Sequence, residues 1–441
     1  MNIVFKIKTA LILILVFALT TSGVSAQAVS GRYVESFPPS IRGQIGITVD
    51  VETGEIIYAK NPDHKAYPAS TTKILTALLL AENTEPDEKI PYTQKAFEQP
   101  SYSLHKDYGP NSIDFELTAH EAMEAIIIYS ANDVSTMVGE YLAGSKEEFS
   151  EMMNERIRKL GLQNTNFLNA NGLHDDNHYT TGYELSVLTR EAFQNDWVRE
   201  VTKQPEVDLR TQNGEFPFEN FKRHLENDGL ILNKGGYTKE SGRSLVALFE
   251  RDGREIAGVV LNSTFVEGTW EGEEFNDMNR IMDWSFEEAH RTPLFQEGEK
   301  YDTYELEYRE GAFWTIPDVL EIPLIPDESV HYYPNELNNR EMTTTFDIEQ
   351  DDAFDIDLDK PIGTLTVHQR EKVDKVDVYT DLSEEDLPEE NNNSSNIISI
   401  ISLITVFVII SIFVIIKKRA TPSKYRESKK LLEKDFWRVY S

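Results

Sequence analysis

The chain of 441 residues contains no cysteine. Disulfide bonds and thiolate chemistry are therefore both excluded. Basic residues are also scarce, with 43 Lys and Arg against 76 Asp and Glu, which gives a formal net charge of −33. Binding to a phosphate backbone needs a basic surface, so nucleic acid is excluded as a partner. The acidity is typical of a strongly solvated or salt-adapted surface, and it should repel anionic ligands.

Long hydrophobic runs are confined to the two ends of the chain. Residues 1–26 combine Lys6 and Lys8, an apolar stretch and the small residues Val24–Ala26, which is the pattern of a secretory signal peptide. An uncleaved anchor is the alternative, but the run is short for a membrane-spanning helix. The sequence therefore predicts export of the mature chain.

A second apolar run, residues 397–416, carries no charge and is followed directly by a basic tail, residues 417–441. Such a run is long enough to cross a bilayer as a helix, and the positive-inside rule places the tail in the cytoplasm. A buried core helix is the alternative, which the basic flank disfavours. We expect a single-pass cell-membrane protein whose main folded part is extracytoplasmic. Removing the tail (+6) and the signal (+2) leaves about −41 on the exported part.

The first two thirds of the exported chain mix strand and helix patterns. Residues 43–61 and 244–263 each predict a strand, a turn and a second strand, with ETGE and RDGR as the turns. Helical spacing of apolar residues predicts helices over 70–83, 118–142 and 146–160, and TAHE is a capping pattern for the second of these. Strands at both ends with helices between them predict an α+β fold, an antiparallel sheet packed with helices.

The pattern of apolar and polar residues changes near residue 296. The segments KYDTYELEY, FDIDLD and TLTVHQREKVDKVDVYT alternate apolar and polar residues, which predicts a separate all-β domain over 296–380 after an α+β domain over 27–295. FDIDLD, at Phe354–Asp359, favours an acidic strand face over a calcium loop, because the glycine and spacing of such loops are absent. The acidic, polar residues 381–396 predict a disordered linker to the membrane helix.

Three short motifs could carry chemistry: Ser70-Thr71-Thr72-Lys73, Ser130-Ala131-Asn132 and Lys234-Gly235-Gly236. Ser70 and Lys73 share one face of a helix, and a lysine whose pKa is lowered can take the proton of a serine hydroxyl. The free N–H groups where a helix begins would stabilise an oxyanion. Alone, Ser70 would be a plain N-cap and Lys73 a solvated residue. The three motifs together, in this order, indicate a serine nucleophile.

The motifs resemble those of the penicillin-recognising serine enzymes, in the contexts PASTTK, YSAND and KGGYT. Longer segments, among them VETGEIIYAKNPDHKAYPASTTK and NTNFLNANGLHDDNHYTTGYELSVL, resemble the low-molecular-mass penicillin-binding proteins, serine-type D-Ala-D-Ala carboxypeptidases of the peptidase S11 family, over roughly residues 40–290. The resemblance implies that residues 27–295 are the catalytic domain, on the extracytoplasmic side, and it extends more weakly to the predicted β domain. It implies that Ser70 attacks the peptide carbonyl and that Lys73 is the general base. It also implies that Ser130 relays a proton to the leaving amine, and that Asn132 holds the substrate amide and orients Lys73.

The resemblance also assigns roles to the third motif. Lys234 would supply positive potential for the substrate carboxylate, and Gly236 would give clearance for a substrate backbone. The N–H groups of Ser70 and Tyr237 would form the oxyanion hole. Gly235 stands where the family keeps a threonine whose hydroxyl helps to bind the carboxylate, and Thr238 is a candidate to replace it. No metal or cofactor is implied. Peptidoglycan stem peptides are the expected substrates, β-lactam antibiotics the expected inhibitors and the membrane the expected attachment.

Three alternatives remain open from the residues. A β-lactamase is disfavoured because NTNFLNANG lacks a glutamate that could drive fast deacylation. A non-catalytic penicillin-binding scaffold has only Gly235 in its favour. HDDNH, at His174–His178, gathers groups that could bind a metal, but it lies in a predicted loop where related proteins resemble it without a metal.

Overall fold

The computed structural model describes residues 37–109, 112, 114–220, 229–266, 272–310, 316–389 and 393–419. The chain divides into two units between Pro38 and Pro39, and the account below concerns residues 39–441. The predicted signal peptide lies outside the described residues, as does the basic tail beyond Arg419. The boundaries of the signal, the linker and the two globular domains stay predictions.

A five-stranded antiparallel sheet in the order β2-β1-β11-β10-β9 forms the centre of the first globular part. Its strands are β1 (Ile45–Asp50), β2 (Ile56–Lys60), β9 (Leu230–Thr238), β10 (Gly242–Arg251) and β11 (Arg254–Ser263). Both predicted strand–turn–strand segments are confirmed. In the turn between β10 and β11, Asp252 and Gly253 have φ of 52° and 78°, the left-handed conformation that this kind of hairpin turn requires.

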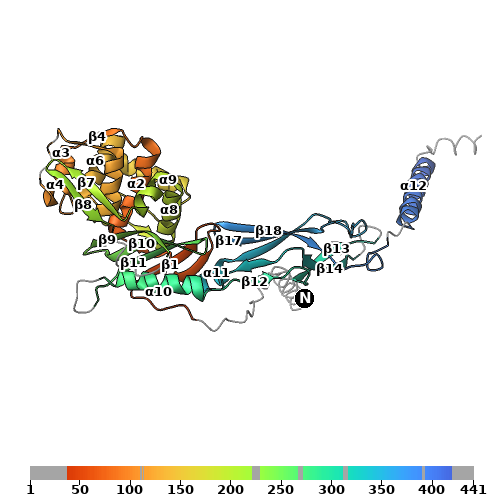
Figure 1. Cartoon of the computed structure of the whole chain (residues 1–441). Coiled ribbons are helices and arrows are strands. Elements are labelled where there is room, and N and C mark those ends of the chain that lie inside the picture. Colours follow the sequence, from red (N-terminus) through yellow and green to blue (C-terminus); the bar gives the residue numbers. More distant parts are fainter. Residues whose placement is uncertain are drawn as a thin grey trace, which may run out of the picture. The chain divides into compact units, whose positions relative to one another are not determined.

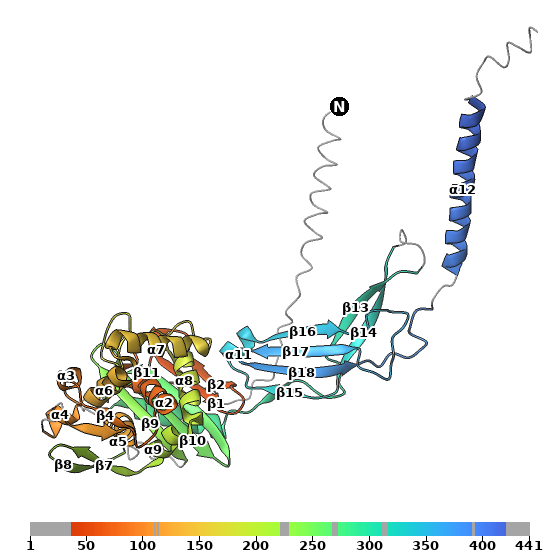
Figure 2. The same cartoon turned by 90° about the horizontal axis from the view of Figure 1, so that it is seen from above.

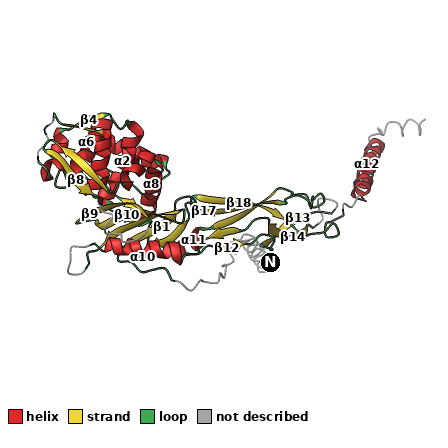
Figure 3. Ribbon diagram, viewed as in Figure 1, coloured by secondary structure: helices red, strands yellow, loops and turns green. Residues whose placement is uncertain are grey.

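Helices cover both faces of this sheet (Figures 1 and 3). Alternation along the strands sends Val246 and Val259 into a core with α2 and α8, whereas Leu245 and Val260 pack against α10. The predicted α+β architecture is confirmed for this part of the chain. The helices are α2 (Lys73–Asn83), α3 (Gln94–Phe97), α4 (Leu104–Asp107), α5 (Ala119–Glu124), α6 (Asn132–Ala143), α7 (Lys146–Lys159), α8 (Gly182–Gln194), α9 (Asp196–Lys203) and α10 (Glu273–Glu287).

The long helix predicted over 118–142 is wrong in one respect, because it is broken in the middle. It starts as predicted, with the capping box of Thr118 and Glu121. After α5 the chain forms a π-helical turn, η2 (Ala125–Tyr129), and then Ser130 adopts φ 74° before α6 begins. π-Helical turns are frequent at functional sites, and this one re-aims the chain at Ser130. The helix predicted over 146–160 is confirmed as α7.

Three two-stranded pieces complete the helical region: β3–β6, β4–β5 and β7–β8. The C-terminal module is built on a five-stranded antiparallel sheet in the order β13-β14-β18-β17-β16 (Figure 2), and β12 pairs with β15 in a separate two-stranded sheet. The remaining bounds are β3 (Lys65–Ala66), β4 (Lys89–Pro91), β5 (Glu116–Thr118), β6 (Thr180–Thr181), β7 (Glu206–Thr211), β8 (Gly214–Glu219), β12 (Thr292–Phe295), β13 (Asp302–Tyr308), β14 (Asp318–Pro326), β15 (Val330–Tyr332), α11 (Glu336–Glu341), β16 (Thr343–Ile348), β17 (Gly363–Gln369) and β18 (Lys372–Tyr379).

The strand predicted at Phe354–Asp359 is wrong, because this segment forms turns. The N–H of Asp359 bonds the side chain of Asp357, and the Gln350 side chain bonds the backbone of Asp357 on both its N–H and its carbonyl. Aspartate side chains that bond nearby backbone compete with a strand ladder, and here that competition prevails over the apolar–polar alternation.

The C-terminal helix α12 covers Asn393–Arg419 and includes the predicted membrane segment. Among the described residues, no helix is both long and apolar enough to cross a membrane, so the predicted spanning helix is not confirmed. The described side chains of α12 run from Ser402 to Lys417. Before it, Leu382 and Leu387 of the predicted linker pack against the core of the β module, so the start of the linker is in contact with that module.

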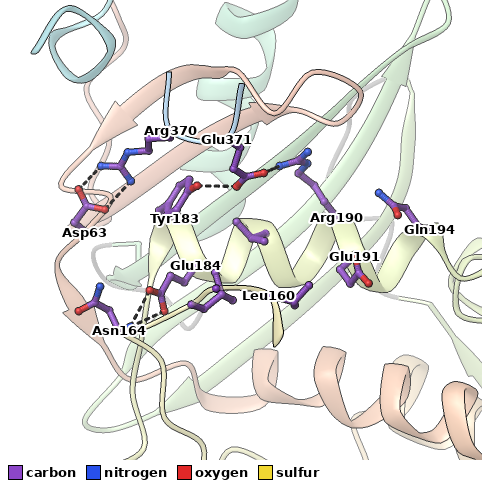
Figure 4. A pocket seen from close by; sticks show the side chains of 13 residues that line it. Asp63, Leu160, Asn164, Tyr183, Glu184, Arg190, Glu191, Gln194, Arg370 and Glu371 are labelled. Carbon is purple, nitrogen blue, oxygen red and sulfur yellow. Dashed lines mark hydrogen bonds and ion pairs between the residues drawn. The ribbon is translucent and has the colours of Figure 1, made fainter. Parts of the chain in front are cut away.

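The hairpin tip between β17 and β18 touches the first globular part of the chain through a set of residues that we call the clasp: Asp63, Tyr183, Arg190, Arg370 and Glu371 (Figure 4). Arg370 donates to both carboxylate oxygens of Asp63 at 2.8 and 2.6 Å. Glu371 accepts from the Tyr183 hydroxyl at 2.7 Å and from Arg190 at 2.9 Å. A pocket of about 650 Å³ lies beside these residues, and no predicted site residue is among those that line it.

Candidate active site

Ser70 lies in a short 3₁₀ turn, η1 (Ala69–Thr72), that leads directly into α2. Ala69, just before it, has φ 51°, which is uncommon for a residue with a side chain and marks local strain. The N-cap of η1 is Pro68 and that of α2 is Thr72, and neither side chain makes a capping bond. The plain N-cap reading of Ser70 is therefore wrong, and its hydroxyl serves another purpose.

Lys73 is fully buried, so its alternative reading as a solvated residue is also wrong. Its Nζ atom lies 3.1 Å from Ser70 Oγ, 2.8 Å from Asn132 Oδ1 and 2.7 Å from the carbonyl oxygen of Asn171. Burial lowers the pKa of Lys73 well below its usual value, and the charge of Lys234 lowers it further. A neutral amine in this position can accept the proton of the Ser70 hydroxyl.

Ser130 and Asn132 reach the site because the helix breaks between them. The left-handed backbone of Ser130 ends the π-helical turn, and its buried Oγ has no hydrogen-bond partner among the described residues. Asn132 opens α6, and its side chain is held from both ends: the amide nitrogen donates to Ser101 O at 2.9 Å while the amide oxygen accepts from Lys73. A buried hydroxyl without a partner is costly, so Ser130 is suited to an incoming group.

The third motif lies on β9, the outermost strand of the sheet in the described part of the chain. Lys234 is 5% exposed, and burial lowers its pKa to about 7. Gly236 lies directly against the nucleophile turn, since a Cβ added there would be 2.8 Å from Ser70 N and 3.1 Å from Pro68 O. The contact of β9 with η1 therefore depends on glycine at this position, and the clearance for a substrate backbone stays a prediction.

The neighbours of Gly236 differ in their surroundings. An added Cβ at Gly235 would meet only Ser244 O, at 3.8 Å, so this position is open. Tyr237 is 49% exposed and packs edge-on against Phe265, with Arg243 near both rings. The Thr238 hydroxyl is engaged in the turn to β10, where it donates to Ser241 Oγ at 3.0 Å and accepts from Ser241 N. Replacement of the missing Gly235 hydroxyl by Thr238 is thus disfavoured.

The floor of the site is formed by residues 167–178, which we call the floor loop and which the sequence does not assign to the site. Besides the bond from Lys73 to Asn171, the Thr76 hydroxyl donates to Ala170 O at 2.7 Å. Gly172, with φ 81°, lies so close to the nucleophile turn that an added Cβ would be 1.8 Å from Ala69 O. The Asn-Gly pair in NANG was the available signal, because such a pair often marks a left-handed turn.

The two histidines of HDDNH face different partners. His174 packs edge-on against Tyr67 and lies 3.4 Å from Asp176, whereas His178 turns inward to Thr72. Within the described ranges, no group of three or more potential metal ligands is close enough to hold an ion. The motif is therefore built for two separate structural contacts.

A partly exposed serine in contact with a buried lysine at the start of a helix, an unpaired serine hydroxyl and a sheet edge with a second buried lysine can together perform acyl transfer through Ser70. With the antiparallel sheet between two helical layers, they define the penicillin-recognising class of serine enzymes. Residues 33–264, more than half of the chain, match the family model described as D-alanyl-D-alanine carboxypeptidase, Peptidase_S11. The chain belongs to this family.

Individual relatives agree with the family assignment. D-alanyl-D-alanine carboxypeptidase DacF of Bacillus subtilis is 27% identical over 257 residues, 57% of this chain and 64% of its own length. DacA of Haemophilus influenzae is 25% identical, and the match spans 63% of that protein. DacD of Escherichia coli is 22% identical over 76% of this chain and 84% of its own. This chain thus spans under two thirds of the first two relatives.

Solved structures give the same fold. Penicillin-binding protein D2 of Listeria monocytogenes, in its cefotaxime-bound form, is 26% identical with a TM-score of 0.50 and covers 57% of this chain and 100% of that one. The carboxypeptidase DacD of Francisella tularensis is 17% identical with a TM-score of 0.57, over 80% of this chain and 98% of that one. The second likeness shows the fold alone.

Proposed function

We propose that the chain is a serine-type D-Ala-D-Ala carboxypeptidase that removes the terminal D-alanine from peptidoglycan stem peptides. The observation that carries this proposal is the placement of Lys73 Nζ, which contacts Ser70 Oγ and Asn132 Oδ1 in a fully buried position. The family membership and the named relatives support the same reaction. Penicillins would acylate the same serine, as the cefotaxime-bound relative suggests by analogy.

The reaction begins when neutral Lys73 takes the Ser70 proton and Ser70 Oγ attacks the carbonyl carbon between the two D-alanines. The N–H groups of Ser70 and Tyr237 bind the oxyanion that forms. Ser130 passes a proton to the leaving amine, the C–N bond breaks and D-alanine departs. Water then hydrolyses the ester on Ser70, which releases the shortened peptide and restores the serine.

The substrate lies along the outer edge of β9, where an extended peptide can add to the sheet. Lys234 attracts its terminal carboxylate, and Asn132 holds its amide. Glycine at position 236 keeps the strand close to Ser70. A fast β-lactamase would need a carboxylate to activate the deacylating water. In the described site, the groups that contact Lys73 Nζ are a hydroxyl, an amide oxygen and a peptide carbonyl. The carboxypeptidase is therefore the favoured reading.

One experiment tests this function. The full-length protein in detergent is incubated with diacetyl-Lys-D-Ala-D-Ala and, separately, with a fluorescent penicillin. We expect free D-alanine and a stable penicillin adduct, both abolished in Ser70→Ala and both retained in Ser329→Ala, a remote control. Rapid turnover of the penicillin would indicate a β-lactamase instead. Reaction with neither reagent would indicate a non-catalytic scaffold.

We also propose that residues 397–416 anchor the chain as a single-pass helix, with the catalytic domain outside and the tail in the cytoplasm. The uncharged run and the basic residues that follow it support this arrangement. Because the chain has no cysteine, single cysteines report topology cleanly. In intact cells, a membrane-impermeant maleimide should label Glu328→Cys and should label Ser423→Cys only after lysis. Labelling of both in intact cells, or extraction of the protein by alkaline carbonate, would refute the anchor.

A further inference from the structure

His178 is a buried histidine that the catalytic steps above do not use. Its ring is 2% exposed and stacks on Phe167 at 4.9 Å with an interplanar angle of 8°. Its Nδ1 atom accepts a hydrogen bond from the Leu168 N–H at 3.0 Å, and its Nε2 atom lies 2.9 Å from Thr72 Oγ1. Both ring nitrogens are therefore committed to specific partners.

These partners fix the proton on the ring. A backbone N–H can only donate, so Nδ1 must be the unprotonated nitrogen. Burial lowers the pKa of His178 to about 3, so the ring is neutral at ordinary pH and carries its proton on Nε2. The Nε2–H group then donates to the Thr72 hydroxyl. This hydroxyl occupies the N-cap position of α2, yet it makes no capping bond to the helix. It is committed to His178 instead.

Thr72 is the last residue of the turn that holds Ser70. The backbone bond from Thr71 N to Pro68 O is long, at 3.4 Å, and Ala69 has a left-handed φ, while the Thr71 hydroxyl donates to the same Pro68 carbonyl at 2.8 Å. These contacts hold the start of the turn, and the side chain of Thr72, at its end, is held by His178. Short 3₁₀ turns have poorer hydrogen-bond geometry than an α-helix, so the end of this turn depends on contacts from outside it. A displacement of Thr72 would shift Ser70 Oγ relative to Lys73 Nζ. The bond from His178 to Thr72 ties the end of the turn to the floor loop and opposes this shift.

We propose that His178 is a positioning residue of the reaction, acting through Thr72 to hold the Ser70 hydroxyl where it contacts Lys73 Nζ. The inference rests on the proposed acylation of Ser70. The same floor loop reaches Lys73 through the carbonyl of Asn171 and touches Ala69 through Gly172. The floor loop therefore fixes the positions of both the nucleophile turn and the general base, and His178 is its side-chain contact to the turn.

Two substitutions of His178 test the two hydrogen bonds of its ring separately. His178→Asn places an amide oxygen where Nδ1 accepts from Leu168, but it does not reach Thr72. His178→Gln places an amide N–H near the position of Nε2 and keeps the bond to Thr72. Displacement of reacting groups by about 1 Å costs roughly a hundredfold in rate. We therefore expect a 10- to 100-fold slower acylation by fluorescent penicillin in His178→Asn, and a rate within about threefold of the native one in His178→Gln.

The decisive test is a double-mutant cycle between His178→Asn and Thr72→Val, with full-length protein and saturation kinetics. If both side chains act through one bond, the double variant is no slower than the slower single variant. The maximal acylation rate should fall while the concentration for half-maximal rate stays unchanged, and melting temperatures show that each protein is folded at the assay temperature. Additive losses in the cycle, or native acylation by folded His178→Asn, would overturn the inference. A native protein that does not react with penicillin at all would instead overturn the proposed function.

Discussion

The Nζ atom of Lys73 lies 3.1 Å from the Oγ atom of Ser70, and the Lys73 side chain is fully buried. The distance suits proton transfer, and the exclusion of solvent makes the amine a weaker base that is neutral at a lower pH. Two further acceptors, on Asn132 and Asn171, fix the direction in which this amine points. The pair therefore behaves as a unit whose reactivity depends on both charge and geometry.

Lys73→Met removes the general base and retains a side chain of similar length. General base catalysis typically contributes 10²- to 10⁴-fold, so acylation by fluorescent penicillin should slow by roughly that factor. Lys106→Met, on an exposed position, is the matched control and should react normally. Thermal melting of both variants checks that they are folded. Acylation of folded Lys73→Met at the native rate would exclude Lys73 as the base.

The pH dependence of acylation should reflect two buried lysines that repel each other. Lys73 must lose its proton to act, so the rate rises with pH through its lowered pKa. Lys234 must keep its proton to attract a carboxylate, and its pKa is about 7, so the rate falls as the pH rises above neutrality. The second-order rate constant reports the free enzyme, and the two limbs belong to the coupled pair. We expect a bell-shaped profile.

Lys234→Arg tests the falling limb, because arginine remains protonated at any accessible pH. The variant should lose the decline above neutral pH, even where its absolute rate is reduced by the larger side chain. Stopped-flow acylation between pH 5 and pH 10 measures both profiles. A decline that persists unchanged in Lys234→Arg would assign that limb to another group.

The sheet, most of the helices and the three motifs could be predicted from the sequence, because period and turn chemistry are local properties. The break at Ser130 could not, since EAIIIYSAND carries an uninterrupted helical pattern and only packing against the rest of the fold selects the π-helical turn. The same limit applies to Phe354–Asp359, where side-chain bonds to backbone override an alternating pattern.

The floor of the site illustrates a second limit. Asn171 contributes a backbone carbonyl and Gly172 contributes the absence of a side chain, so neither has a residue type that suggests catalysis. His178 did suggest chemistry, but as a metal ligand, because its sequence neighbours are acidic. Its actual partner, Thr72, is over a hundred residues away in the chain. Contacts of this kind depend on tertiary structure and leave no local pattern.

The two glycines of the third motif should respond differently to the same change. Gly236→Ala would bring a methyl group to 2.8 Å from Ser70 N, so β9 or the nucleophile turn must shift. We expect acylation to fall about a hundredfold, the cost of displacing the reacting groups by about 1 Å. Gly235→Ala is the matched control, since its methyl group meets nothing closer than 3.8 Å, and it should react within a few-fold of the native rate. Equal losses in both variants would contradict the close approach at Gly236.

Gly235→Thr asks whether the hydroxyl that this chain lacks limits its reaction. The position has room for a side chain, and a hydrogen bond to a charged carboxylate contributes roughly 1.5–3 kcal/mol. D-Alanine release should therefore rise about tenfold or more in Gly235→Thr compared with Gly235→Val, which has the same shape without the hydroxyl. Equal rates in the two variants would mean that the missing hydroxyl is not limiting.

The clasp should stabilise the chain without contributing to catalysis. Arg370→Ala removes the fork that bonds Asp63 and also the contact of Arg370 with Glu341. Asp63 is 48% exposed and is therefore well screened, so the loss should be only about 1 kcal/mol, or roughly 2 °C in melting temperature. Lys360→Ala, which breaks the exposed pair with Asp357, should have almost no effect. D-Alanine release should be native in both variants.

Because part of the clasp is open to solvent, high salt should reduce the difference in melting temperature between Arg370→Ala and the native protein. A melting temperature for Arg370→Ala that equals the native one at low salt would show that the clasp contributes nothing to stability.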